Sequence, residues 1–376
     1  MFDIVIIGGG VAGLMSAYKM TRIGLSVALV EKMSTLASGP STRNEGWLHR
    51  GTYHACSIED RDNALQVAAR CIYGHEQLLN FCPEAIEDRD VRPIAMLRDG
   101  NRIDDVISRW NEAGVRYRQI TCSEASSRCS DADFDRADAL FEVNDVSINT
   151  RLLYRKLSAK ARQAGCVFFL GYDITRIEGT TLTITNSEDD EVTLKGSKIV
   201  YTAGGGVRDL FKKFHNVDIP IRYWKSHLVV TQRLSDAGIF YLDAQEAAMM
   251  HHGNVSIVGF NEDALLSALP DYEVAPDRAN NLRRGIARIF PNWRPNDALD
   301  VACVKVDLVD NHKDARSLNI AIREPIENHV VALPGKLTEA PYLTDALIAQ
   351  VHEAVDDTSI SRRPCDDIHD RKVFAA

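Results

Sequence analysis

Polar side chains able to react or to bind a ligand are concentrated between residues 41 and 54 of this 376-residue chain. His49 belongs to the side-chain type whose pKa lies nearest neutrality, so it is the first candidate to accept a proton or to stabilise a charge. Arg43 and Arg50 flank it, and a planar guanidinium can clamp a carboxylate through two hydrogen bonds. Tyr53 adds a hydroxyl at the end of the stretch. These residue types indicate proton transfer on a small anionic molecule.

A glycine turn near the N-terminus predicts that the chain also binds a dinucleotide. Gly8, Gly10 and Gly13 follow an apolar strand at residues 2–7 and open a helix, and Glu31 ends the next strand. In this fingerprint the glycines allow a tight turn, a close approach of the backbone to a pyrophosphate, and close packing of helix on strand. The helix N-terminus would bind the phosphates, and the Glu31 carboxylate would bind ribose hydroxyls. The turn alone fits FAD or NAD.

Further helices and strands must position these residues. The N-terminal pattern predicts a β-α-β unit that ends at Glu31, and Asn149 is placed to cap a later helix. We expect helices over 62–81, 147–164 and 276–290 and from about residue 342, and strands within 166–186, 198–206, 219–309 and 329–335. Residues 83–141 show no clear period and are expected to begin a second lobe.

Composition excludes several classes of protein. The net charge of −9 and the absence of a basic stripe argue against a nucleic-acid partner. No run of eighteen apolar residues is present, so no transmembrane segment is expected. The eight cysteines include no C-x-x-C pair, which leaves a zinc site without support. Dispersed thiols in a long chain without a recognisable signal peptide predict a cytoplasmic protein.

The stretch Ser41-x-x-Asn44-x-Gly46-x-x-His49-x-Gly51-x-Tyr53 resembles a segment of L-2-hydroxyglutarate dehydrogenases. These belong to the D-amino-acid-oxidase-like (DAO) superfamily of FAD-dependent oxidoreductases, with glycerol-3-phosphate dehydrogenases and glycine and sarcosine oxidases. Segments 171–174, 202–205 and 334–338 follow in the family's order and resemble its adenine-side strand, its second flavin-proximal turn and its C-terminal flavin loop. Residues 45–47 and 52–54 depart from the dehydrogenase pattern where substrate would sit, so the substrate is not carried over.

The resemblance implies bound FAD and names the residues that would contact it. These are Gly8, Gly10, Ala12, Gly13, Glu31, Lys32, Ser41, Asn44, Gly46, Ile174, Ala203, Gly204, Gly335, Lys336, Leu337 and Thr338. His49 and Arg323 are the expected catalytic residues, with Arg323 as the better candidate to bind a carboxylate. Arg43, Tyr53, His227 and His252 are the expected substrate contacts. Neighbouring side chains on a strand point oppositely, so the pair His251 and His252 is not expected to bind a metal.

The resemblance also implies a fold and an activity. The expected fold is α/β, a Rossmann-like FAD-binding domain with an interleaved α+β substrate domain built on an antiparallel sheet. The FAD-binding domain would comprise residues 1–82, 142–215 and 326–376, and the substrate domain residues 83–141 and 216–325. The expected activity is transfer of a hydride to flavin N5 from the CH–OH or CH–NH carbon of a small, anionic 2-hydroxy acid or amino acid.

Several points stay open in the sequence. Oxygen, a quinone or a carrier protein would reoxidise the flavin, and neither the stereochemistry nor covalent attachment of FAD is readable. One alternative is a flavin monooxygenase that uses NAD(P)H, although Pro334–Thr338 stands where those enzymes carry G-D-A. A second alternative is a flavin-binding redox sensor without turnover.

Overall fold

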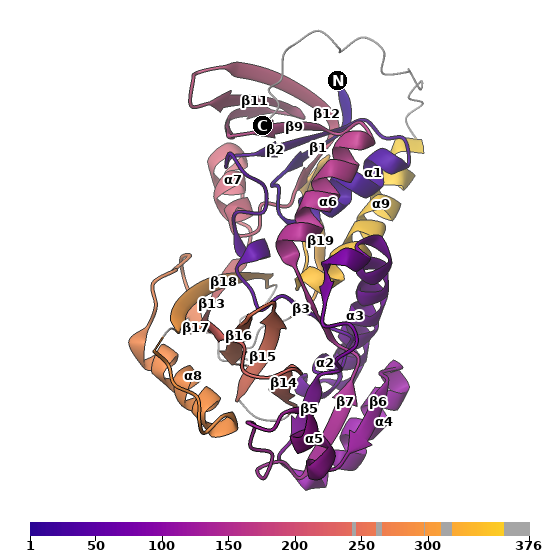
Figure 1. The fold of residues 1–376 in the computed structure, drawn as a ribbon. Coiled ribbons are helices and arrows are strands. Elements are labelled where there is room, and N and C mark those ends of the chain that lie inside the picture. Colours follow the sequence, from indigo (N-terminus) through magenta and orange to yellow (C-terminus); the bar gives the residue numbers. More distant parts are fainter. Residues whose placement is uncertain (243–245, 261–264, 297, 310–317, 357–376) are drawn as a thin grey trace.

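The computed structural model describes residues 1–242, 246–260, 265–296, 298–309 and 318–356 (Figure 1). The last part of the predicted first lobe, residues 357–376, lies outside these described residues. Two large sheets and one small sheet form the scaffold, with the larger sheets at opposite ends of the molecule. No helix in the described ranges is long and apolar enough to cross a bilayer.

The first sheet has eight strands and contains the N-terminus. Its strands are β1 (Phe2–Ile7), β2 (Val27–Glu31), β9 (Val167–Leu170), β10 (Tyr172–Glu178), β11 (Thr181–Asn186), β12 (Glu191–Tyr201), β19 (Ala321–Ile326) and β20 (His329–Leu333). Five of them, in the order β20-β12-β1-β2-β9, run parallel. Because β1 lies between β12 and β2, the connections leave it on opposite sides, and a crevice opens at its carboxyl end.

Helices cover both faces of this sheet, as a doubly wound fold requires. On one face lie α1 (Val11–Arg22), α3 (Arg61–Phe81), α6 (Thr150–Gln163) and α9 (Ala340–Asp356), and on the other α7 (Gly206–His215). Ile4 and Ile6 of β1 pack toward α1, whereas Val5 and Ile7 pack toward α7. This alternation follows from the two-residue period of a strand and explains the apolar run of β1.

The second sheet is antiparallel except for the β5–β14 pair. Its strands are β5 (Ile94–Leu97), β6 (Tyr117–Ile120), β7 (Ala139–Val143), β13 (Ile221–Gln232), β14 (Ile239–Tyr241), β15 (Ala247–His252), β16 (Val255–Phe260), β17 (Leu265–Ser267) and β18 (Leu299–Leu308). Helix α8 (Pro276–Ile289) packs Leu282 and Ile286 against Val229 and Val258 of one face. Helices α4 (Ile103–Ala113) and α5 (Cys122–Arg128) pack near β5, β6 and β7.

A three-stranded sheet joins the two parts. It consists of β3 (Trp47–Leu48), β8 (Val146–Ile148) and β4 (Ile86–Glu87). The remaining described elements are α2 (His54–Ser57) and the 3-10 turns η1 (Pro40–Thr42), η2 (Pro83–Ala85), η3 (Gly100–Arg102) and η4 (Leu337–Glu339). The residues that the sequence singled out around His49 therefore lie beside this junction.

The predicted fold class is confirmed: a parallel sheet between helices is followed by a second, antiparallel sheet. The N-terminal β-α-β unit has the expected bounds, and Asn149 caps α6 by accepting the Leu152 N–H at 3.1 Å. The expected helix over 147–164 is wrong at its start, because Ser147 belongs to β8 and α6 begins at Thr150. Strand β8 pairs with β3 and β4, which lie far away in the chain. The helical spacing of the apolar residues after Ser147 therefore could not indicate this strand.

Candidate functional site

The glycine turn has the geometry that the fingerprint requires. Gly8 has a φ of +110°, and a Cβ placed there would lie 2.7 Å from the Ala203 backbone. A Cβ on Gly13 would lie 1.9 Å from the Gly8 carbonyl oxygen, so only glycine lets α1 pack on the turn. The Thr202 hydroxyl donates to the Ile7 carbonyl at 3.1 Å and to the Gly8 carbonyl at 2.9 Å. The first and second predicted flavin turns are thus in direct contact.

Glu31 and Ser41 approach the N-terminus of α1. Glu31 Oε2 accepts the Gly9 N–H at 2.7 Å, and Ser41 Oγ accepts the Val11 N–H at 3.0 Å. Gly10 is the N-cap residue of α1 and carries no side chain that could fill this end of the helix. The helix terminus, with a carboxylate beside it, suits a phosphate-bearing nucleotide whose ribose hydroxyls donate to Glu31.

Other predicted cofactor residues differ in placement. Ala12 is buried in α1, whereas the Lys32 side chain is exposed after β2. Ile174 is buried in the core beside β11, so its side chain is structural and only its backbone remains for a ligand. Gly204 has a φ of +57° and follows Ala203 in the second turn.

Asn44 shapes the loop that carries His49. Its Nδ2 donates to the Ser41 carbonyl at 2.8 Å, and its Oδ1 accepts the Gly46 N–H at 2.8 Å. Gly46 has a φ of +60°, and a Cβ there would lie 2.3 Å from Cε1 of His252. The serine, asparagine and glycine of the motif therefore act first as turn-forming residues, which side-chain-to-backbone hydrogen bonds favour.

His49 stands where three distant segments meet. Its N–H donates to Thr338 Oγ1 at 3.2 Å, and its Nδ1 lies 3.9 Å from Oδ1 of Asp145. Its ring lies 4.3 Å from that of Trp47 and 4.5 Å from that of His54, centroid to centroid. The side chain is 17% exposed, so a small molecule can reach it.

Asp145 is a member of this cluster that the sequence reasoning missed. Its side chain is fully buried and accepts hydrogen bonds from Trp47 Nε1 at 3.0 Å, from the Arg50 N–H at 3.0 Å and from the Thr52 hydroxyl. Burial raises the pKa of the Asp145 carboxyl, and these hydrogen bonds oppose that change. Nothing in the sequence around residue 145 marks it, because all its partners lie more than ninety residues away.

The C-terminal loop is held by helix α3. Buried Glu339 pairs with Arg70 Nε at 2.7 Å and with Lys336 Nζ at 2.8 Å. The predicted cofactor residue Lys336 thus uses its ammonium group structurally, and only its backbone remains for a flavin. A Cβ on Gly74 of α3 would lie 1.7 Å from the Thr338 carbonyl oxygen. The sequence analysis did not identify Arg70, Gly74 or Glu339. The one signal for this contact was Gly74 itself, because a glycine inside a helix often marks a close packing contact.

One face of the second sheet approaches this cluster. The Trp47 ring lies 4.5 Å from that of Phe240, and Glu45 Oε1 lies 3.4 Å from Lys305 Nζ on β18. A Cβ on Gly259 of β16 would lie 2.9 Å from Glu45 Oε1. Lys305, also unnoticed in the sequence, supplies a partly exposed cation beside the His49 loop.

The predicted substrate contacts are scattered by the fold. Tyr53 is buried with its ring 6.2 Å from that of Trp47, and the Arg43 guanidinium lies 5.2 Å from the exposed Tyr272 ring. His227 Nε2 accepts the Ala275 N–H at 2.9 Å, at the start of α8. That contact lies on the α8 face of β13, the same face as Val229.

His252 and Arg323 lie on different sheets, His252 at the end of β15 and Arg323 on β19. His252 lies between two acceptors, Glu87 Oε2 at 2.5 Å from Nδ1 and the Glu45 carbonyl at 2.8 Å from Nε2. Burial lowers the pKa of His252, but the hydrogen bonds to Glu87 and Glu45 outweigh it and leave the pKa raised. Arg323 has an exposed side chain on β19, the edge strand beside β20. The Tyr223 hydroxyl of β13 donates to the Gly205 carbonyl at 2.9 Å, beside the second predicted flavin turn.

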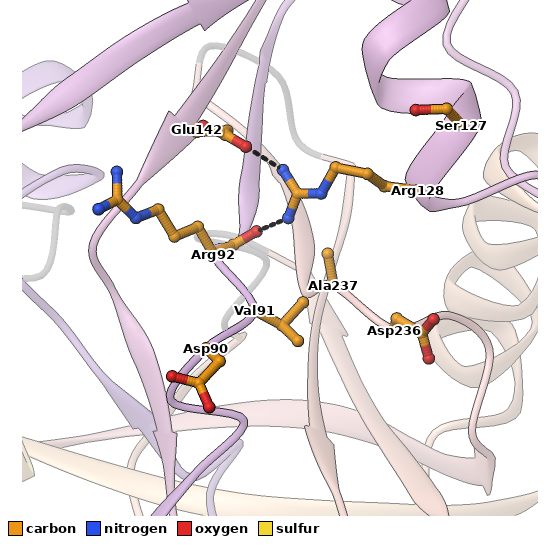
Figure 2. Close-up of a pocket in the computed structure, with 8 residues that line it drawn as sticks. All are labelled: Asp90, Val91, Arg92, Ser127, Arg128, Glu142, Asp236 and Ala237. Carbon is orange, nitrogen blue, oxygen red and sulfur yellow. Dashed lines mark hydrogen bonds and ion pairs between the residues drawn. The ribbon is translucent and has the colours of Figure 1, made fainter.

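A separate pocket of about 430 Å³ lies near α5, at the opposite end of the molecule from the glycine turn (Figure 1). Arg128 spans its wall, donating to the Glu142 carboxylate and to the Arg92 carbonyl, each at 2.5 Å (Figure 2). Since these groups satisfy one another, the pocket has the chemistry of a surface ion-pair network. The candidate site is therefore the crevice around Gly8, His49 and Thr338.

Sequence comparison places the chain among flavoenzymes. The family model described as FAD dependent oxidoreductase, DAO, matches residues 3–325. L-2-hydroxyglutarate dehydrogenase of Bos taurus is 35% identical over 143 residues, which are 38% of this chain and 23% of that protein. Glycerol 3-phosphate oxidase of Mycoplasma pneumoniae is 45% identical over 49 residues, 13% of each chain. The matches thus span about a quarter or less of the length of these curated relatives.

Solved structures share the fold over nearly the whole chain. Glycine oxidase from Geobacillus kaustophilus has a TM-score of 0.72 at 17% identity, over 94% of this chain and 95% of its own. L-alpha-glycerophosphate oxidase from Mycoplasma pneumoniae, solved with FAD bound, has a TM-score of 0.75 at 18% identity, over 93% and 94%.

Proposed function

The chain belongs to the DAO family of FAD-dependent oxidoreductases, and from that premise we propose that it oxidises the CH–OH or CH–NH carbon of a small anionic substrate, a 2-hydroxy acid or an amino acid. The observation that carries the proposal is the position of His49. It is partly exposed, and it is tied through Thr338 to the loop that the family uses for its flavin. A group that accepts a substrate proton must lie beside the hydride acceptor, and this histidine meets that requirement.

The residues present fit FAD. Gly8 and Gly13 let the turn pack tightly on Ala203 and on α1, and Gly10 puts no side chain at the N-terminus of α1, so a ligand can approach the backbone there. Glu31 lies at the end of β2 where ribose hydroxyls can donate. The backbone of residues 335–338 and the start of α9 would hold the flavin's pyrimidine end. Bound FAD supplies the hydride-accepting chemistry of the family, and the protein supplies orientation and charge.

His49 would take the proton from the substrate's hydroxyl or ammonium group. A positioned base of this kind contributes about 10²- to 10⁴-fold to a rate. The second sheet covers the site from the side of Trp47 and Phe240, which limits water near the reacting carbon. Tyr53 and Arg43 remain proposed contacts at the same loop.

We propose two cations for the substrate's anionic end. Arg323 is the candidate from the sequence, and Lys305 is the candidate from the structure because it reaches Glu45 in the His49 loop. Glu45, the partner of Lys305, offers an anion that can bind a substrate ammonium group. This pair of charges favours amino acids over hydroxy acids as substrates. A charge-assisted hydrogen bond is worth roughly 1.5–3 kcal/mol, or about a tenfold change in KM or more.

The test is anaerobic reduction of the bound flavin, followed by its visible absorbance. The panel contains 2-hydroxy acids, amino acids and glycerol phosphate. Bleaching by one class names the bond that is oxidised, and His49→Gln should then slow bleaching by that substrate about a hundredfold. Lys305→Met and Arg323→Met, compared on the same substrate, identify the cation that binds it. His215→Gln, a change on α7, is the matched histidine control. A flavin that NADPH bleaches while the whole panel leaves it oxidised refutes the proposal in favour of a monooxygenase.

A further inference from the structure

A buried carboxylate without a cation in direct hydrogen-bond contact needs an explanation, and Asp145 is such a group. It lies between β7 and β8 with its side chain fully buried. Its donors are an indole N–H, a backbone N–H and a hydroxyl, all from residues 47–52. Removing a carboxylate from water is costly, and a neutral acceptor could satisfy some of these donors at lower cost. A carboxyl group at this position therefore calls for a use beyond accepting these hydrogen bonds.

The neighbour that can use this charge is His49. Its Nδ1 lies 3.9 Å from Asp145 Oδ1, which is a charge contact and longer than a hydrogen bond. The Trp47 ring packs against the His49 imidazole. The Thr338 hydroxyl accepts the backbone N–H of His49. The ring is thus confined with its Nδ1 edge toward the carboxylate and its Nε2 edge directed away from it.

The other titratable groups around His49 are neutral or directed elsewhere. Burial lowers the pKa of His75 to about 4, and its Nδ1 contacts the Leu48 carbonyl at 3.3 Å. Burial raises the pKa of the Cys71 thiol to about 12; this thiol lies 4.0 Å from Nδ1 of His54, whose ring faces His49 edge-on. The Tyr53 ring lies edge-on to that of His54, with 5.5 Å between the ring centroids.

Arg50 is the cation of this cluster. Its guanidinium pairs with Glu76 at 3.1 Å, and its charge also acts on Asp145. On the loop below, Lys336 and Arg70 are paired with Glu339. Asp145 is therefore the anion whose contact with the His49 ring can stabilise a positive imidazole.

We propose that Asp145 is a positioning residue for His49, fixing the tautomer with hydrogen on Nδ1 and stabilising the imidazolium that forms when Nε2 takes the substrate's proton. In that step the O–H or N–H bond of the substrate breaks, its electron pair stays on the substrate, and an Nε2–H bond forms on His49. The ring then carries one positive charge opposite the Asp145 carboxylate. The inference rests on the proposed function, because it assigns His49 the role of base.

The first test needs no substrate. Carbethoxylation of His49 by diethyl pyrocarbonate is followed by mass spectrometry of its peptide in the FAD-loaded protein from pH 5 to pH 9, since only the neutral ring reacts. Asp145→Asn should move the midpoint of the profile to lower pH by about 0.7 or more, the effect of a unit charge at about 4 Å even in water. Ser147→Ala is the matched control, because that buried hydroxyl on β8 accepts the His251 N–H rather than a group of the His49 cluster. A midpoint that Asp145→Asn leaves in place overturns the proposal.

The second test is a double-mutant cycle on flavin reduction. Asp145→Asn should slow reduction about tenfold or more in the wild-type background and by less than about twofold in His49→Gln, because the two residues act as one unit. Equal losses in both backgrounds, with equal flavin content, show a structural role and overturn the proposal.

If no substrate reduces the wild-type flavin, the proposed function fails while the carbethoxylation result still decides the contact between Asp145 and His49. If Asp145→Asn fails to fold, Thr52→Val is tested instead, because it removes one hydrogen-bond donor to the carboxylate. This variant should raise the midpoint pH of the carbethoxylation profile. An unchanged midpoint overturns the proposal.

Discussion

Gly74 of helix α3 packs against the Thr338 carbonyl with no space for a side chain, and this supports a sharp prediction. A Cβ at position 74 would lie 1.7 Å from that oxygen and 2.8 Å from its carbon. An ordinary contact needs about 3.4 Å, so Gly74→Ala must separate α3 from the C-terminal loop by more than an ångström. The obstacle is backbone, which a rotamer change cannot relieve. The Thr338 hydroxyl that binds the His49 N–H would be displaced with it.

Two opposing effects set the magnitude. Alanine is better than glycine in a helix interior by about 1 kcal/mol, so the substitution would stabilise α3 if space allowed. Overpacking of a tight interior costs about 1–3 kcal/mol, and more when backbone must move. We expect Gly74→Ala to lower the free energy of unfolding by about 1–3 kcal/mol net. Flavin affinity should fall about tenfold or more, since the displaced loop is part of the predicted flavin site.

Gly285 in α8 is the matched control, because it is also a glycine inside a helix. A Cβ there would meet the Phe260 ring at 3.1 Å and the Ala247 side chain at 3.2 Å, so side chains with small shifts can absorb it. Gly285→Ala should stay within about 1 kcal/mol of wild type. Urea unfolding of the FAD-loaded proteins measures stability, and fluorescence titration of the apoproteins measures flavin affinity. A Gly74→Ala protein as stable as Gly285→Ala, with wild-type flavin affinity, would refute the reasoning.

Three further predictions concern other residues of the structure. Glu31→Ala removes the acceptor of the Gly9 N–H and should weaken FAD binding about tenfold in the same titration; unchanged affinity would contradict the ribose assignment. The pKa of His252 is raised in the folded protein, so protonated His252 stabilises the fold fully below about pH 6.5. This contribution is lost as pH rises through the folded-state pKa. The difference in free energy of unfolding between wild type and His252→Gln should therefore shrink from pH 6 to pH 9. Burial lowers the pKa of His251 to about 4, so stability should fall between about pH 6.5 and pH 4, by about 3 kcal/mol at most, and His251→Asn should show a flatter dependence of Tm on pH. Parallel Tm profiles for His251→Asn and wild type would contradict this assignment.

The parts of the fold that the sequence predicted are those that short-range physics determines. Gly8 and Gly13 can be recognised because backbone conformation and packing within a few residues demand glycine there. Asn149 predicts the start of helix α6 because its side chain accepts the N–H of a residue three positions later. The alternation of side chains on strand β15 likewise separates His251, bonded to Ser256, from His252, bonded to Glu87.

The features that the sequence did not predict depend on pairs of segments far apart in the chain. Asp145 and Thr52 are 93 residues apart, and Arg70 and Glu339 are 269 apart. A single sequence holds no record of which distant acid faces which donor. The same reason explains why Lys305 was not recognised beside Glu45.

Two buried acids near His49 differ in a way that bears on its chemistry. Glu339 is bonded to Arg70 and Lys336, so its charge is neutralised locally and serves to hold the C-terminal loop. Among the residues that the structure describes, the donors to Asp145 are neutral, so more of its field remains at the His49 ring. If the protein needed only a rigid loop at His49, an arrangement like that of Glu339 would provide it. The Asp145 carboxylate, which has no cation among its direct hydrogen-bond donors in the described residues, is best understood as stabilising a positive charge that appears on the neighbouring imidazole during turnover.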